Sequence, residues 1–251
     1  MSGTQPFEPG GYRFIPAVFQ YSSGVAALPG FAIRRVRFKI PIPMAQGFGV
    51  IERIIRQVGR PLTALCASEL RSPAQVSDAG FQSFNEDYVV ALRAWGLFDG
   101  VTNPVARSNV CPERNPPPAP AFHAFSFTVA DAAAAPSFVI AGSGEARAGS
   151  APYRERIIAH GDVSAGAMRE KARFVLDEME RRLGLFGFTW SDTTATHVYT
   201  VHDLHPFLDS EIVRRGAAHA GLDWHYCRPP VIGLEYEMDC RAVHMQEVVS
   251  S

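Results

Sequence analysis

Three acidic residues recur at every second position near the end of the chain: Glu235, Glu237 and Asp239. This alternation places side chains on one face of a β-strand, and we expect a strand over residues 231–240 with an apolar opposite face. Neighbouring acids on a partly buried face raise the pKa of a carboxyl group toward the range useful for proton transfer. Because Arg228 precedes the run and arginine binds carboxylates in a bidentate manner, the stretch predicts acid–base chemistry on a carboxylate. A plain amphipathic edge strand is the alternative.

We assign catalytic roles to Glu235, as the acid or base, and to Arg228, as a carboxylate anchor. The other candidates for substrate binding lie in loops or turns, where the alternative for each arginine is a solvated surface position. These candidates are Arg107, Arg147, Arg154, His225, Tyr226 and Cys227. An arginine lowers the pKa of an adjacent thiol, so Arg228 favours the thiolate form of Cys227. No partner base is identifiable nearby, which argues against a nucleophilic cysteine.

Sequence motifs for metal ions and phosphate groups are absent. His197, His202 and His205 lie close together in the sequence, but their spacing matches no standard zinc pattern. Gly142-Ser143-Gly144 is too short for a phosphate-binding loop. The four cysteines form no CxxC pair, so we expect free thiols. The sequence therefore predicts no metal and no organic cofactor.

The composition is that of an ordinary globular protein, with 251 residues of which 47% are hydrophobic. A net charge of -1 gives no electrostatic reason to expect binding to nucleic acid or to an anionic membrane. No run approaches the roughly 18 apolar residues of a membrane span, and the N-terminus lacks the features of a signal peptide. We expect a cytoplasmic protein whose partner is a small carboxylate molecule.

The order of the expected elements is the same in the two halves of the chain. In each half a helix ends at a glycine, and a strand, a second helix, an arginine-containing turn and a last strand follow. The expected helices span residues 51–58, 78–95, 164–184 and 204–215. We divide the chain into a flexible arm, a first domain, a linker and a second domain, at residues 1–11, 12–130, 131–136 and 137–251. The fold class is α+β, with a mixed β-sheet and two helices on one of its faces in each domain.

Two short motifs resemble the RidA/YjgF family. Residues 104–110, with the sequence PVARSNV, resemble the family's P-A-R-S-x-V signature with one inserted valine, and LEYE at residues 234–237 resembles its terminal I-E-I-E strand. The resemblance implies two fused chorismate-mutase-like domains and an assembly into a homotrimer with clefts between neighbours. Active members of the family hydrolyse enamines and imines without a cofactor. The resemblance gives Arg107 the role of carboxylate anchor and Glu235 a role in positioning water.

Neither half of the chain keeps both parts of that site. The last strand of the first half lacks a glutamate, and the second half has Cys-Arg-Pro-Pro in place of P-A-R-S. A composite site across the two halves and the degeneration of one site both fit this pattern. Among family members, the chain resembles two-copy deaminases of 2-aminomuconate and its 5-chloro form, which release ammonia during the degradation of aromatic compounds. The alternatives are a hydrolase of an enol-pyruvyl ether, as in chorismatases, and a module that binds carboxylate metabolites without catalysis.

Overall fold

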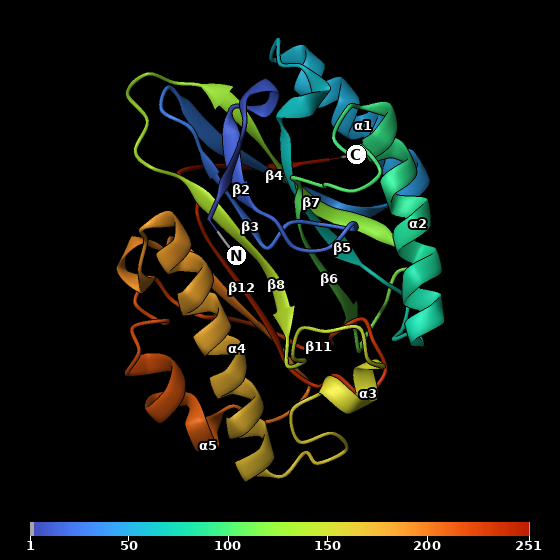
Figure 1. Ribbon diagram of the computed structural model, residues 1–251, viewed down its shortest axis with the longest axis vertical. Coiled ribbons are helices and arrows are strands. Elements are labelled where there is room, and N and C mark those ends of the chain that lie inside the picture. Colours follow the sequence, from blue (N-terminus) through green and yellow to red (C-terminus); the bar gives the residue numbers. More distant parts are fainter. Residues whose placement is uncertain (1–2, 251) are drawn as a thin grey trace.

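Two mixed β-sheets pack against each other at the centre of the molecule, and helices cover their outer faces (Figure 1). The computed structural model describes residues 3–250. One sheet has seven strands in the order β1 (Gln5–Phe7), β2 (Tyr12–Ile15), β3 (Gly24–Ala27), β8 (Phe138–Gly144), β12 (Glu237–Ala242), β9 (Ala195–Tyr199) and β10 (Asp223–His225). The other has six, in the order β11 (Cys227–Arg228), β6 (Ala106–Pro112), β5 (Leu65–Arg71), β7 (Ala121–Ala130), β4 (Phe31–Pro43) and β13 (Met245–Val249).

The helices form an outer layer on each side. In Figure 1, α1 (Met44–Gln57) and α2 (Asp78–Ala94) lie on the side of the six-stranded sheet, while α4 (Ala165–Phe186) and α5 (His205–Phe207) lie on the opposite side. Three short 3-10 helices (Glu8–Gly10, Leu62–Ala64 and Trp190–Asp192) and the four-residue α3 (Tyr153–Arg156) complete the helical elements, together with a π-helix at Leu208–Val213. The structure confirms the α+β class. Among the described residues, no helix has the length and apolar character required to cross a membrane.

The two halves of the chain exchange strands. β2 and β3, from the first half, extend the seven-stranded sheet through the pairing of β3 with β8. In return β13, the last strand of the chain, pairs in parallel with β4, and β11 pairs with β6. β1, in the segment predicted as a flexible arm, pairs with β2; residues 1 and 2 of that arm lie outside the described residues. The predicted division into two fused domains stays a prediction.

Serine side chains begin the two long helices α2 and α4, where the sequence left open Ser77 or Asp78 for the first helix and Asp162 or Ser164 for the second. Ser77 Oγ accepts a hydrogen bond from the Gly80 N–H at 3.2 Å, and Ser164 Oγ accepts one from the Ala167 N–H at 3.3 Å. Each bond satisfies one of the N–H groups that have no partner in the first turn of a helix. The helix starts are therefore fixed by local chemistry.

Three predicted helix boundaries are wrong. α1 begins at Met44 and not at residue 51, where the expected helix started. α4 does not end at Gly184 but continues to Phe186, whose ring is buried in the core, and Gly187 ends the helix with a positive φ of 80°. The helix expected over residues 204–215 is divided into α5 and the π-helix. At Phe186, tertiary packing, which a periodic pattern does not record, decides where regular structure stops.

The predicted closing strand also begins later than expected. β12 starts at Glu237, because residues 231–234 form a turn in which the Leu234 N–H donates to the Val231 carbonyl at 3.1 Å and Gly233 has a φ of 93°. From Glu237 onward the predicted alternation holds. Met238 and Cys240 pack in the core beneath α4, and the acids point to the other face, between the sheets.

The apolar stripe of α4 gives a test of the fold. Leu176 is fully buried in this stripe. Replacing it with alanine removes packed methyl groups and leaves a cavity, so Leu176→Ala should lower the free energy of unfolding by about 2 to 5 kcal/mol in urea titrations. Glu170 is exposed on the same helix, and Glu170→Ala should change that energy by less than about 0.5 kcal/mol. Equal losses in the two variants would contradict the assigned face.

Candidate functional site

One cavity of about 690 Å³ lies where the two sheets meet. Its walls come from the segment between β2 and β3, from strands β6, β8 and β12, and from α3 and α4. Arg107 on β6 and Glu237 on β12 both line it. A residue from the first half of the chain and one from the second therefore contribute to the same site.

Arg107 is the buried cation of this cavity. Its side chain is surrounded by aromatic rings whose centroids lie 4.8 to 5.7 Å from the guanidinium carbon, namely those of Tyr21, Phe81, Phe84 and Tyr88. Nη2 donates to Asn85 Oδ1 at 2.6 Å, whereas Nη1 is buried without a hydrogen-bond partner among residues 3–250. Burial lowers the pKa of Arg107. A buried guanidinium with a spare donor is well suited to bind a carboxylate.

Glu237 is the buried acid of the same cavity. It is only 5% exposed, and burial together with the charges of Asp239 and Glu145 raises its pKa well above the ordinary value. A Cβ atom at position 142 would collide with the Glu237 carboxyl group, so Gly142 leaves the space that this side chain occupies. A raised pKa makes a carboxyl group better suited to act as a general acid.

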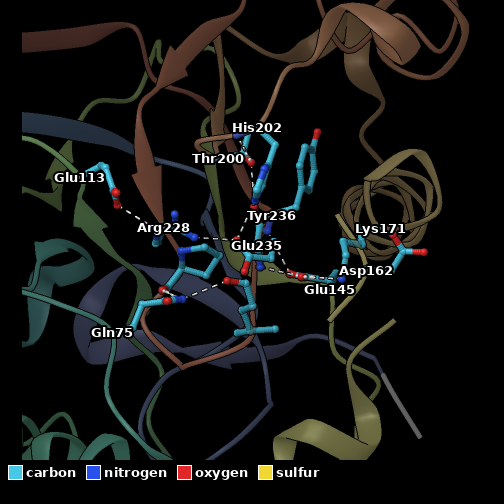
Figure 2. A network of polar contacts seen from close by, with 12 residues as sticks. Gln75, Glu113, Glu145, Asp162, Lys171, Thr200, His202, Arg228, Glu235 and Tyr236 are labelled. Atoms are coloured by element: carbon cyan, nitrogen blue, oxygen red, sulfur yellow. Dashed lines mark hydrogen bonds and ion pairs between the residues drawn. The ribbon is translucent and has the colours of Figure 1, made fainter. Parts of the chain in front are cut away.

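A buried carboxylate fixes the chain just before Glu237 (Figure 2). Glu145 Oε1 accepts the Glu235 N–H at 2.7 Å, and Glu145 Oε2 accepts the Tyr236 N–H at 3.1 Å. Lys171 from α4 lies 3.4 Å from Glu145 Oε1 and donates to the Ile158 carbonyl at 2.6 Å. Both side chains of this pair are fully buried. The pair therefore anchors the backbone immediately before β12 and Glu237.

Arginines also surround the mouth of the cavity. Arg181 and Arg182 are paired with Glu178, and Arg156 donates to the backbone carbonyls of residues 147 and 151. Arg147 is exposed at the mouth, and no hydrogen bond or ion pair joins its guanidinium to another residue of the described chain. A second anionic group of a ligand would meet Arg147 there.

Residues 4–247 match the family model described as 2-aminomuconate deaminase CnbZ. A 2-amino-5-chloromuconate deaminase from Comamonas testosteroni is 51% identical over 245 residues, which cover 97% of this chain and 98% of that protein. The chain belongs to the 2-aminomuconate deaminase CnbZ family.

Two solved structures are more distantly similar to this family member. A chorismatase is 14% identical, with 96% of this chain and 79% of that chain covered and a TM-score of 0.44. A candidate endoribonuclease from Thermotoga maritima is 18% identical, with 43% of this chain and 78% of that chain covered and a TM-score of 0.32.

The structure places Glu235 and Arg228 outside the cavity of this family member. Glu235 Oε2 lies 2.8 Å from both His202 Nε2 and Arg228 Nη1, and Arg228 also pairs with Glu113 at 2.9 Å (Figure 2). The two residues predicted to be catalytic therefore neutralise each other beside the cavity. Their catalytic roles stay predictions, whereas Glu237, two residues further along, faces Arg107 across the cavity.

Of the residues predicted to bind substrate, Arg107 and Arg147 line the cavity, and the exposed Arg154 does not. His225 and Tyr226 also lie elsewhere; Tyr226 is 52% exposed, and burial lowers the pKa of His225 to about 4.

The prediction that Arg228 favours a Cys227 thiolate is wrong. Cys227 is 6% exposed, and burial raises the pKa of its thiol above the ordinary value. The side chain of Arg228 is held by Glu113 and Glu235. Arg228 is adjacent to Cys227 in the sequence but does not lower the pKa of its thiol, because the effect of burial is larger than that of the neighbouring cations.

Sequence reasoning missed Glu237 as the cavity acid and Tyr21 and Tyr153 as lining residues. Glu237 did belong to the row of acids, but the alternation could not show where the strand begins. The aromatic spacing of α2 did contain a signal, since residues 81, 84 and 88 lie on one helical face and enclose Arg107.

The raised pKa of Glu237 predicts a pH-dependent loss of stability. Because the folded-state pKa lies above the value in the unfolded chain, the native state binds a proton that the unfolded state releases. The contribution of Glu237 therefore falls as the pH rises from about 4.5 toward the raised pKa. In thermal unfolding, Glu237→Gln should exceed the wild type in Tm near pH 7.5, and the difference should shrink toward pH 4.5. A difference in Tm that is the same at every pH would refute this assignment.

Proposed function

We propose that this protein is a hydrolytic deaminase of an unsaturated 2-amino dicarboxylate, of the 2-aminomuconate or 2-amino-5-chloromuconate type, that needs no metal or organic cofactor for the reaction. The 51% identical relative carries that second substrate in its name. The observation that supports the chemistry is a cavity lined by both a buried acid, Glu237, and a buried arginine, Arg107. The product would be ammonia and an unsaturated 2-oxo acid.

The protonated Glu237 carboxyl group begins the proposed reaction. It donates its proton to a carbon of the enamine, which becomes an iminium ion, and the resulting carboxylate then takes a proton from water as the hydroxide adds to the iminium carbon. Glu237 next protonates the amino group of this adduct. The C–N bond breaks, ammonia leaves, and the proton of the new hydroxyl group returns to Glu237 as the carbonyl group forms.

Two arginines would hold the two carboxylates of the substrate. Arg107 offers its spare Nη1 donor in the closed part of the cavity, and Arg147 lies free at the mouth. Tyr21 and Tyr153 also line the cavity, and their aromatic rings would pack against a conjugated chain and exclude water. Arg147 takes the role that the sequence suggested for Arg228.

The family membership favours this reaction over the chorismatase-like hydrolysis and over the non-catalytic binding module. The homotrimer expected from the resemblance stays a proposal, which light scattering after size-exclusion chromatography would test. The cytoplasmic location also stays a prediction.

The choice between the two glutamates can be tested by ammonia release from freshly generated 2-aminomuconate and its 5-chloro form. Glu237→Gln keeps the shape of the side chain but cannot donate a carboxyl proton, so the rate should fall by about 10² to 10⁴. Glu235→Gln should keep most of the activity, because that residue lies outside the cavity. Loss of activity in Glu235→Gln but not in Glu237→Gln would return the catalytic role to Glu235. If the wild type releases ammonia no faster than the spontaneous rate, the proposed function is refuted.

Arg147 and Arg154 give a matched pair for the second carboxylate. Both are exposed and lie in one segment, but only Arg147 lines the cavity. Arg147→Ala should raise KM and leave kcat nearly unchanged, as expected when an interaction is equally strong in the ground state and the transition state. Arg154→Ala should change neither constant. Steady-state kinetics on both variants distinguish the two positions, and equal effects would exclude a specific role for Arg147.

A further inference from the structure

A second group of chemically competent side chains lies where β9 pairs with β10. The parallel register places Asp223 opposite His197, and His225 follows two residues later on the same face of β10. One possible ligand atom from each of these three residues lies within 4.8 Å of the other two. Two imidazoles and one carboxylate are a donor set of the kind that divalent transition metals use in proteins.

The surroundings of His197 orient its ring toward this group. His197 Nδ1 lies 3.2 Å from Asp239 Oδ1 and 3.0 Å from the Tyr199 hydroxyl oxygen, while Nε2 lies 3.4 Å from Asp223 Oδ2. When Nδ1–H is donated to Asp239, the lone pair of Nε2 points at the Asp223 carboxylate. In that tautomer a cation between the two atoms would relieve their repulsion. A carboxylate behind the imidazole is the usual outer-shell partner of a metal-bound histidine.

His225 supplies an independent observation. Its Nε2 atom is buried and has no hydrogen-bond partner within residues 3–250, although a buried polar atom normally has one. Its ring lies 4.8 Å from the ring of His197. The Asp223 side chain is 70% exposed, so an ion can reach the group from solvent, and water can complete its coordination.

Nearby charges select the class of ion. Arg241 Nη2 lies 3.0 Å from His197 Nδ1, and the guanidinium of Arg71 lies 5.5 Å from the ring centre of Tyr199. Asp239 and Glu69 offset part of this positive charge. A hard cation such as Mg²⁺, which prefers oxygen ligands, gains little here. A cation that bonds well to imidazole nitrogen can overcome the repulsion.

We propose that His197, Asp223 and His225 bind a divalent transition metal of the zinc class at the edge of the seven-stranded sheet. None of the three lines the cavity that contains Arg107 and Glu237, so this site is separate from the proposed deamination. The ion would tie the short edge strand β10 to β9. It would also act through Asp239, whose Oδ2 accepts a hydrogen bond from Ser108 on β6 at 2.6 Å, on the packing of one sheet against the other.

The test is the binding of Co²⁺ to the full-length, chelator-treated protein. Equilibrium dialysis with metal analysis measures the bound metal, and visible absorption reports its coordination. The wild type should bind one equivalent of Co²⁺, Zn²⁺ should displace it, Mg²⁺ should not, and bound Zn²⁺ should raise the Tm. Asp223→Asn changes an exposed side chain and should fold normally. That variant and His225→Gln should lose affinity by about tenfold or more.

His219→Gln, which alters an exposed histidine outside the group, is the matched control and should bind as the wild type does. Binding that persists unchanged in both Asp223→Asn and His225→Gln would assign the metal to other residues and overturn the proposal. Absence of binding by the wild type would do the same. Neither outcome affects the deaminase assay, so failure of this site is distinguishable from failure of the proposed function.

Discussion

The position of the candidate acid depends on one buried carboxylate, that of Glu145. Its two oxygens accept consecutive backbone N–H groups just before β12, and Lys171 from α4 supplies the opposite charge. Removing two charges from water is costly, and such a pair is retained only where hydrogen bonds satisfy both partners. Here the pair joins the end of β8, the helix α4 and the start of β12. Together with Gln75, which donates to the carbonyls of residues 229, 231 and 234, it holds the chain that leads to Glu237.

The same arrangement separates the roles of neighbouring acids. Glu235 forms an ion pair with Arg228 and a hydrogen bond with His202. Glu237 lines the cavity. Asp239 accepts hydrogen bonds from Ser108, Tyr199 and Arg241. Burial and the charges of Asp239 and Glu145 raise the pKa of Glu237, whereas cationic neighbours lower the pKa of Asp239. Three acids of one short stretch thus acquire different chemistry from their partners alone.

The sequence was sufficient for features that depend on local chemistry, and less so for features that depend on distant contacts. The serine caps, the apolar stripe of α4 and the alternation after Glu237 follow from side-chain spacing. The start of β12 depends on Glu145, about ninety residues earlier in the chain, and the pairing of His197 with Asp223 depends on sheet register. Arg107 and Arg147 were identified because the family motif and the loop composition pointed to them. Glu235 was chosen over Glu237 because the resemblance to the family's terminal strand assigned the glutamate role to residue 235.

The exchanged strands have a consequence for the order in which the protein can be completed during synthesis. β2 and β3 emerge early from the ribosome but find their partner β8 only after β4, β5, β6 and β7 of the six-stranded sheet have been made. The edge of β4 remains unpaired for longer, because its partner strand β13 is made later. Arg34 on β4 and its partner Glu247 on β13 are 213 residues apart in the chain. Contacts of such separation form slowly. The β4 edge therefore stays open until β13 has been made, and an open edge can pair with a neighbouring chain. Crowded polysomes would be the setting in which this protein most needs a chaperone.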